Sequence, residues 1–164
     1  MTPLLAISGL AVTFPGRRPV AALSGVDLTV GKGEVVAFVG ESGSGKSVTS
    51  LATMGLLPPN ARVSGQARFA RRDGTHVDLL DPRAAARARG VEIAMIFQEP
   101  MTSLNPVMRV GEQIGEGLRV HERASAAAAR ARARERLARA GIPDPDRRLD
   151  SYPHEMSGGM RQRA

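Results

Sequence analysis

Cysteine is absent from this 164-residue chain, and histidine is scarce. The lack of cysteine excludes disulfide bonds, thiolate metal sites and a cysteine nucleophile. The three histidines, His76, His121 and His154, are too widely spaced in the sequence to suggest a metal-binding cluster. Nothing in this composition points to a zinc protein.

Long apolar runs are missing as well. Runs such as residues 35–39 are far shorter than the ~20 residues of a membrane-spanning helix, and no charged and then apolar leader opens the chain. We therefore expect a cytosolic protein unless another protein holds it at a membrane. With 164 residues, 42% of them hydrophobic, the chain can form one domain, or part of one, with a substantial core.

Lysine is rare too, and the positive charge is carried almost entirely by arginine, because only Lys32 and Lys46 are lysines. The net charge of +7 has its surplus in residues 61–164, which include an alanine- and arginine-rich segment at residues 124–140. The arginines of this segment spread around a helix instead of forming one stripe, and aromatic residues for base stacking are missing there. We expect a solvated helix, and nucleic-acid binding stays open as the less favoured alternative.

The pattern of apolar residues, glycine and proline predicts an α/β chain. A turn at residues 15–19 joins strands at residues 4–14 and 21–30, and the Asp73-Gly74 pair favours a second hairpin, so we expect a small antiparallel sheet over residues 4–30 and 65–80. Continuous apolar runs at residues 35–39 and 93–97 are typical of strands buried on both faces. Helices are expected at residues 46–57, ended by Pro58 and Pro59, and at residues 82–89, 110–118 and 125–140.

A glycine-rich segment between a predicted strand and a predicted helix fits the phosphate-binding P-loop. It consists of Gly40, Glu41, Ser42, Gly43, Ser44, Gly45, Lys46 and Ser47, which is a glycine, four residues and then Gly-Lys-Ser. Backbone N–H groups can wrap phosphate oxygens only where side chains are absent and positive φ is tolerated, and the glycines meet both conditions. Lys46 would reach the β- and γ-phosphates of a nucleotide, and the Ser47 hydroxyl would bind Mg²⁺. The alternative, a flexible turn before a helix, is rare in this context.

Two further segments distinguish between the kinds of P-loop protein. The sequence Met156-Ser157-Gly158-Gly159-Met160 resembles the signature motif of ATP-binding-cassette proteins, usually Leu-Ser-Gly-Gly-Gln, and departs from it at Met156 and Met160. Residues 93–106 are similar to the Q-loop region of the oligopeptide/dipeptide importer branch, in which Ser-Gly-Gly-Met-Arg-Gln-Arg is also usual. The resemblance runs from about Leu4 to the last residue.

The resemblance implies an α/β fold with a P-loop NTPase core, an antiparallel β subdomain and a helical subdomain. We expect one incomplete ATP-binding domain: the β subdomain and core over residues 1–106, the helical subdomain over residues 107–157 and the start of the signature helix over residues 158–164. The family places an Asp-Glu strand and a switch histidine after the signature, beyond Ala164. The 164 residues alone are therefore expected to be inactive, and the full-length protein is expected to be an ATPase.

The resemblance also assigns the site residues and the cofactors, ATP and Mg²⁺. Nucleotide binding is expected from the P-loop through Val48, with Phe14 stacking on adenine. Gln98 would act with Lys46 in catalysis and would contact Mg²⁺ and the attacking water. The residues expected to close over the ATP of a partner subunit, in a head-to-tail dimer, are Ser157, Gly158, Gly159 and Met160. A place for Phe14 in the core stays open, as does an ordinary helix-capping turn at Ser157.

The function implied is that of the motor subunit of a peptide importer. ATP binding would close the dimer and hydrolysis would open it, while two transmembrane permeases alternate their access and an extracytoplasmic solute-binding protein delivers the cargo. Residues 99–105 would line the groove that receives a permease helix, so the protein would lie peripherally on the cytoplasmic face of the membrane. Two alternatives stay open: a non-catalytic nucleotide-binding fragment, and a soluble ATP-binding-cassette protein that acts on DNA or ribosomes.

Overall fold

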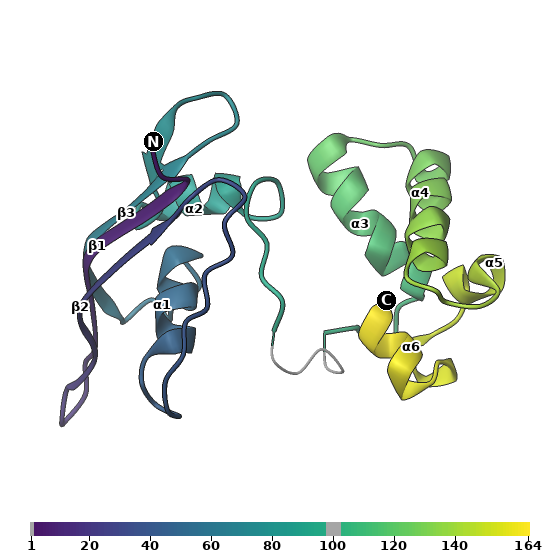
Figure 1. Cartoon of the computed structure of the whole chain (residues 1–164). Coiled ribbons are helices and arrows are strands. Elements are labelled where there is room, and N and C mark those ends of the chain that lie inside the picture. The colour runs from purple at the N-terminus through teal and green to yellow at the C-terminus, as the bar shows by residue number, and fades with distance from the viewer. Residues whose placement is uncertain (1, 98–102) are drawn as a thin grey trace. The chain divides into compact units, whose positions relative to one another are not determined.

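The computed structural model describes residues 2–97 and 103–164. The chain forms two compact units, Met1–Ile93 and Ala94–Ala164, here called unit 1 and unit 2 (Figure 1). Each unit has its own hydrophobic core. The predicted subdomain boundary after residue 106 stays a prediction.

Unit 1 is built on an antiparallel sheet of four strands in the order β2-β1-β3-β4. The strands are β1 (Leu5–Phe14), β2 (Val20–Val30), β3 (Arg62–Ala70) and β4 (His76–Asp78). Alternate side chains of a strand point to one face, and Leu10, Val12 and Ala67 are fully buried on the face that carries the core. Helices α1 (Lys46–Thr53) and α2 (Pro82–Ala88) contribute Ala52 and Ala88 to the same core.

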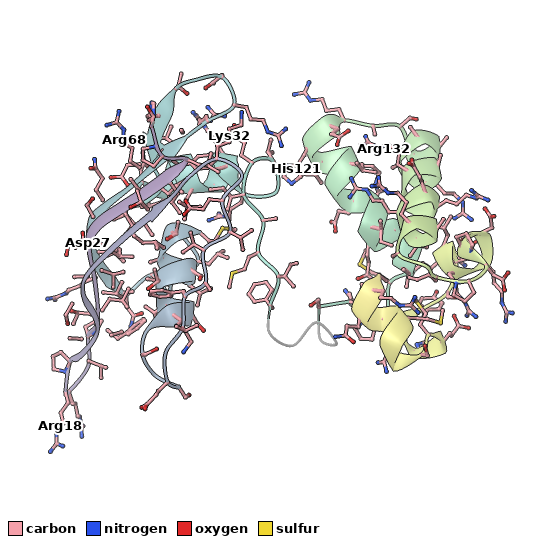
Figure 2. All side chains as sticks on the ribbon, in the orientation of Figure 1. Arg18, Asp27, Lys32, Arg68, His121 and Arg132 are labelled. Carbon is pink, nitrogen blue, oxygen red and sulfur yellow. The ribbon has the colours of Figure 1, made fainter. Side chains whose placement is uncertain are left out.

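Both predicted hairpins are confirmed. β1 pairs antiparallel with β2, and Arg18 lies at the tip of the turn between them (Figure 2). β3 pairs with β4 through a turn in which the Asp73 carboxylate accepts hydrogen bonds from the backbone N–H of Thr75, at 2.9 Å, and from its hydroxyl, at 2.6 Å. This local bonding explains why an Asp-Gly pair at this point closes the hairpin.

The prediction of buried strands at residues 35–39 and 93–97 is wrong. Residues 35–39 are not in a strand, and Val35 is 95% exposed. In the second segment only Ile93 forms an isolated bridge, with Arg89, while Ile96 is 92% exposed. A strand needs a neighbour to pair with its backbone groups, and no strand of the described residues lies beside either run.

Helix α1 is shorter than predicted. It ends at Thr53, with Met54 as its C-cap and Gly55 at φ +62°, so the prolines at residues 58 and 59 do not end it. A glycine with positive φ just after the last turn is a common helix stop. The predicted helix at residues 82–89 is confirmed as α2, whose N-cap Asp81 accepts a hydrogen bond from the Arg83 N–H.

Unit 2 is helical. Its helices are α3 (Val110–Glu122), α4 (Ala126–Arg139), α5 (Pro145–Leu149), the 3-10 helix η2 (Pro153–Glu155) and α6 (Gly158–Arg163). α3 runs four residues beyond the predicted end, and α5 was not predicted. The buried core residues of the unit are Val110, Ala133, Leu137, Ile142, Leu149, Met156 and Met160. No helix of the described residues is both long enough and apolar enough to cross a membrane.

The arginine-rich helix α4 packs through a stripe of small and apolar residues. Ala129, Ala133 and Leu137, spaced by four, are buried. The arginines between them pair with acidic side chains of the same unit: Arg130 with Asp150, Arg132 with Glu122 and Arg134 with Asp146 (Arg132 is labelled in Figure 2). Hydrogen bonds from Arg130 and from Arg134 hold the pKa values of the Asp150 and Asp146 carboxyl groups below their usual range. The predicted solvated helix is confirmed, and these three arginines serve local contacts.

The packing of α4 predicts which aliphatic side chain of unit 2 stabilises the fold. Leu137 is 1% exposed, so Leu137→Ala leaves a cavity and is expected to lower the free energy of unfolding by about 2–5 kcal/mol. Val120, on α3, is 65% exposed, and Val120→Ala is expected to change the free energy of unfolding by no more than about 0.5 kcal/mol. Urea unfolding followed by circular dichroism measures both. Equal losses from the two variants would contradict the packing described.

Candidate functional site

The predicted P-loop connects an exposed segment to helix α1. Residues 40–44 are exposed, whereas Gly45, the N-cap of α1, is buried. Gly43 and Gly45 have φ values of +84° and +92°, a left-handed conformation that side chains disfavour. No side chain caps the start of α1, so the first N–H groups of the helix are not used by a capping residue.

A close contact with the sheet fixes Gly45. A Cβ atom at this position would lie 2.4 Å from Cδ2 of Leu23 and 3.2 Å from the carbonyl oxygen of Ala22, both on β2. The left-handed φ and the nearby backbone carbonyl of Ala22 therefore favour glycine where the end of the loop packs on the β-sheet. The contact holds the start of α1 against β2.

The ammonium group of Lys46 is held inside the loop. It donates hydrogen bonds to the carbonyl oxygens of Gly40 and Glu41, each at 2.7 Å, and to the Ser44 hydroxyl at 3.2 Å. The Ser44 N–H in turn donates to the Glu41 carbonyl at 3.2 Å. The loop is thus curled around one positive charge.

Helix α1 packs through one face and leaves part of its first turn exposed. Thr49, Ala52 and Thr53 are buried, and the Thr49 and Thr53 hydroxyls donate to the carbonyls of Gly45 and Thr49 at 3.0 and 2.9 Å. Val48 is half-buried against the core of unit 1. Ser47 is exposed, and no hydrogen bond of its hydroxyl is seen among the described residues. Its oxygen is accessible at the end of the helix where the loop lies.

Phe14 lies at the end of β1, half-buried and in contact with the core of unit 1. It pairs with Val20 across the β1–β2 hairpin, and Thr13 pairs with Ala21. The next two residues of β2, Ala22 and Leu23, are the ones that contact Gly45. Phe14 therefore lies toward the same end of the hairpin as the residues that contact Gly45, and it is only partly buried.

The predicted signature segment forms a capped turn in unit 2. Ser157 is the N-cap of α6, and its hydroxyl accepts a hydrogen bond from the Met160 N–H at 3.3 Å. Gly158 and Gly159 are exposed. Met156 and Met160 are 4% and 8% exposed and belong to the core of unit 2, so both departures from the usual motif fill the interior.

Two arginines that were not predicted from the sequence bind the C-terminal ends of α4 and α1. Arg163 of α6 donates to the carbonyls of Ala140 and Gly141, at 3.2 and 2.8 Å, where α4 ends. Arg89 donates to the carbonyls of Met54 and Gly55, where α1 ends. Neither arginine could have been identified from the residues next to it in the sequence. The only local signal lies at the acceptors: each pair includes a glycine just after a helix, where carbonyl groups lack partners within the helix.

The remaining predicted site residue, Gln98, lies outside the described residues. The P-loop and Phe14 belong to unit 1, and the signature segment belongs to unit 2. The structure therefore brings Phe14 and the P-loop to one end of the β1–β2 hairpin. Among the described residues, no group of three or more histidine and acidic side chains is placed to hold a metal ion.

The fold is that of known nucleotide-binding cassettes. A solved structure described as a dimer of the bacterial ABC transporter cassette MJ0796 matches with a TM-score of 0.76 and 28% identity, over 97% of this chain and 66% of that one. A second structure of MJ0796, in a post-hydrolysis state bound to ADP and Pi, also matches with a TM-score of 0.76, at 26% identity. The predicted α/β fold class is confirmed.

Curated relatives match nearly the whole chain. A Brucella ovis protein, provisionally named a peptide import ATP-binding protein, is 52% identical over 167 residues, which are 99% of this chain and 49% of that protein. The dipeptide transport ATP-binding protein DppD of Bacillus subtilis is 47% identical and the oligopeptide transport ATP-binding protein OppD of Mycobacterium tuberculosis 49% identical, each over 99% of this chain. The chain spans about half the length of the first two relatives and 26% of OppD. Because a model of the ABC transporter family also matches residues 23–164, the chain belongs to that family.

Proposed function

We propose that this chain is the nucleotide-binding part of the ATP-driven motor of a membrane importer for peptides or similar small solutes. The observation that carries the proposal is the P-loop itself, in which Lys46 is held by loop oxygens beside the uncapped start of α1. An anion at this place would meet backbone N–H groups, a helix N-terminus and one ammonium group together. The names of the relatives, which refer to peptide, dipeptide and oligopeptide transport, support the choice of cargo class.

ATP would bind by replacing hydrogen bonds that the loop now makes with itself. The Lys46 ammonium group can exchange the carbonyls of Gly40 and Glu41 for phosphate oxygens, which are stronger acceptors because they are charged. The backbone from Gly40 to Val48 would surround the phosphates, and Phe14 would stack on the adenine. The accessible Ser47 hydroxyl fits a ligand of Mg²⁺, with Gln98 as the second proposed ligand. When bound, Mg²⁺ supplies charge neutralisation at the phosphates.

A second copy or a close relative would complete the site. We propose that Ser157, Gly158 and Gly159 face the ATP of a partner subunit in a head-to-tail dimer, since their backbone is exposed in a capped turn. Met160 would take part only through its backbone, because its side chain lies in the core. The relative MJ0796 is described as a dimer, which supports this arrangement.

Hydrolysis would need chain beyond these residues. The apolar runs at residues 35–39 and 93–97, most of whose residues are exposed, have the composition of core strands but no neighbouring strand among the described residues. We propose that a further segment of a longer protein pairs with them and brings the acidic residues that orient the attacking water. The length of the relatives, about twice that of the chain, supports such a segment.

The proposed partners are two transmembrane permeases, and indirectly an extracytoplasmic solute-binding protein. The importer motor would then lie on the cytoplasmic face of the membrane as a peripheral subunit. A nucleic-acid partner is not proposed, since Arg130, Arg132 and Arg134 are engaged with acidic residues of unit 2. The proposed subdomains remain residues 1–106, 107–157 and 158–164.

The first prediction concerns the two lysines of the chain. Lys46→Ala is expected to abolish useful ATP affinity while leaving the fold intact, because it removes the ammonium group at the centre of the P-loop. Lys32→Ala is the matched control, since Lys32 is an exposed turn residue and the other lysine. Titration with a fluorescent ATP analogue measures both. Unchanged affinity in a folded Lys46→Ala variant would refute the P-loop assignment.

The second prediction separates stacking by Phe14 from core packing. Phe14→Ala is expected to weaken ATP and GTP binding alike by about 1–3 kcal/mol, because every base has a face on which an aromatic ring can stack. Phe14→Leu keeps apolar contacts with the core and should also lose affinity, whereas Phe14→Tyr should keep it. Nucleotide titrations and thermal melts of all three variants provide the test. A Phe14→Leu variant that binds ATP like the parent would assign Phe14 to the core alone.

The third prediction compares this chain with a full-length protein that contains it. Positioning and charge stabilisation account for most phosphoryl-transfer catalysis, so residues 1–164 alone are expected to turn over ATP several orders of magnitude more slowly. The exposed apolar runs should also make the isolated chain prone to aggregation. Steady-state phosphate release measures the rates. Full turnover by the isolated chain, lost in Lys46→Ala, would show that its own residues suffice for hydrolysis.

A further inference from the structure

Arg89 occupies the C-terminal end of the P-loop helix. Its Nη1 donates hydrogen bonds to the carbonyl oxygens of Met54, at 2.7 Å, and Gly55, at 3.1 Å. Arg89 is the C-cap of α2 and lies 34 residues after Gly55 in the sequence, so this is a tertiary contact within unit 1. The side chain is half-buried between the two helices.

Helix α1 depends on such a contact because it is short. It has eight residues and no basic residue in its last turn, and isolated helices of this length are not stable in water. The last carbonyl groups of any helix lack partners within it, and a positive charge there also complements the helix dipole. Arg89 provides both the donor and the charge, from outside the helix.

Gly55 gives the guanidinium group its room. A Cβ atom at Gly55 would lie 2.9 Å from the Ala85 Cβ and 3.1 Å from the Arg89 Nη1, and the residue has φ +62°. Ala85 is fully buried on α2, so it cannot move away cheaply. Glycine at this position therefore lets α2 and Arg89 approach the end of α1.

The backbone of Arg89 is tied to a second segment. Arg89 forms the isolated bridge with Ile93, and the Gly90 N–H donates to the Ile93 carbonyl at 2.9 Å. The N–H groups of Glu92 and Ile93 both donate to the Ala88 carbonyl, at 2.8 and 3.1 Å. The Glu92 carboxylate, 7% exposed, accepts from Nε of Arg71 at 3.0 Å, which fastens the same turn to the end of β3. Arg89 thus joins α1 to a turn that is itself held by several hydrogen bonds.

We infer that Arg89 is a positioning residue, whose guanidinium group holds α1, and with it Lys46, at a fixed place relative to the turn that ends in Ile93. The structural part of this inference, the hold of Arg89 on α1, is independent of the proposed function, whereas the expected effect on ATP hydrolysis rests on it. A loosened α1 would still carry Lys46, but the ammonium group would reach the phosphates less often in the productive geometry. The turnover number should therefore suffer more than the affinity for ATP.

The test uses the full-length protein with Arg89→Ala, Arg89→Lys and the control Arg87→Ala. Arg87 is exposed on the same helix, and no hydrogen bond of its side chain is seen among the described residues. Hydrogen exchange of peptides that cover residues 46–57 is expected to accelerate in Arg89→Ala and not in Arg87→Ala, while peptides from β1 and β2 keep the parent rate. The kcat for ATP hydrolysis should fall about 10- to 100-fold in Arg89→Ala, with a smaller factor in ATP affinity, and Arg89→Lys should recover part of both losses.

Parent-like exchange of residues 46–57 in Arg89→Ala would overturn the inference, and so would faster exchange with a kcat equal to that of Arg87→Ala. If Arg89→Ala unfolds globally, Gly55→Ala decides: its added methyl group would lie 3.1 Å from Nη1 and crowd the guanidinium, so it should accelerate exchange at residues 46–57 selectively. Parent-like exchange in Gly55→Ala would then contradict the inference. A parent protein that does not bind ATP would refute the proposed function instead, since the exchange measurement needs no nucleotide.

Discussion

Backbone groups at the ends of helices have no partner within their own helix, and much of what the described residues do follows from how those groups are satisfied. At the start of α1 no side chain caps the helix, which leaves N–H groups next to the P-loop. At the start of α6 the Ser157 hydroxyl caps one N–H group and leaves the two glycines exposed. A phosphate group is a suitable acceptor at a helix start, which is why the proposed nucleotide site includes the start of α1.

The C-terminal ends of two helices, α1 and α4, are closed by arginine side chains. Arg89 satisfies carbonyl groups at the end of α1, and Arg163 does so at the end of α4. In each case the acceptors include a glycine that follows the helix, and the arginine comes from another helix of the same unit. Each bond therefore stabilises a helix end and also fixes the orientation of two helices. For α6 this contact joins the signature turn to the longest helix of unit 2.

The need of backbone groups for partners also explains why the two apolar runs, residues 35–39 and 93–97, do not form strands. Residues 35–39 enter the P-loop, and residues 93–97 lead toward Gln98, so both flank proposed site segments. Without a neighbouring strand among the described residues, these runs join no sheet ladder, and most of their side chains stay exposed, although Ile93 packs on the core of unit 1. The loop at residues 40–45 is therefore curled around Lys46, while the apolar run that precedes it, residues 35–39, is not part of any sheet among the described residues.

The sequence alone determined the features that depend on neighbouring residues. The Asp73-Gly74 hairpin, the β1–β2 hairpin and α4 all follow from patterns within about ten residues. Tertiary structure decided the rest. The contact of Gly45 with Leu23, the place of Met160 in a core and the bond from Arg89 to Met54 each join residues that are distant in the chain. Strand formation at residues 35–39 belongs to this second class, because an apolar run becomes a strand only when another segment supplies the partners for its backbone.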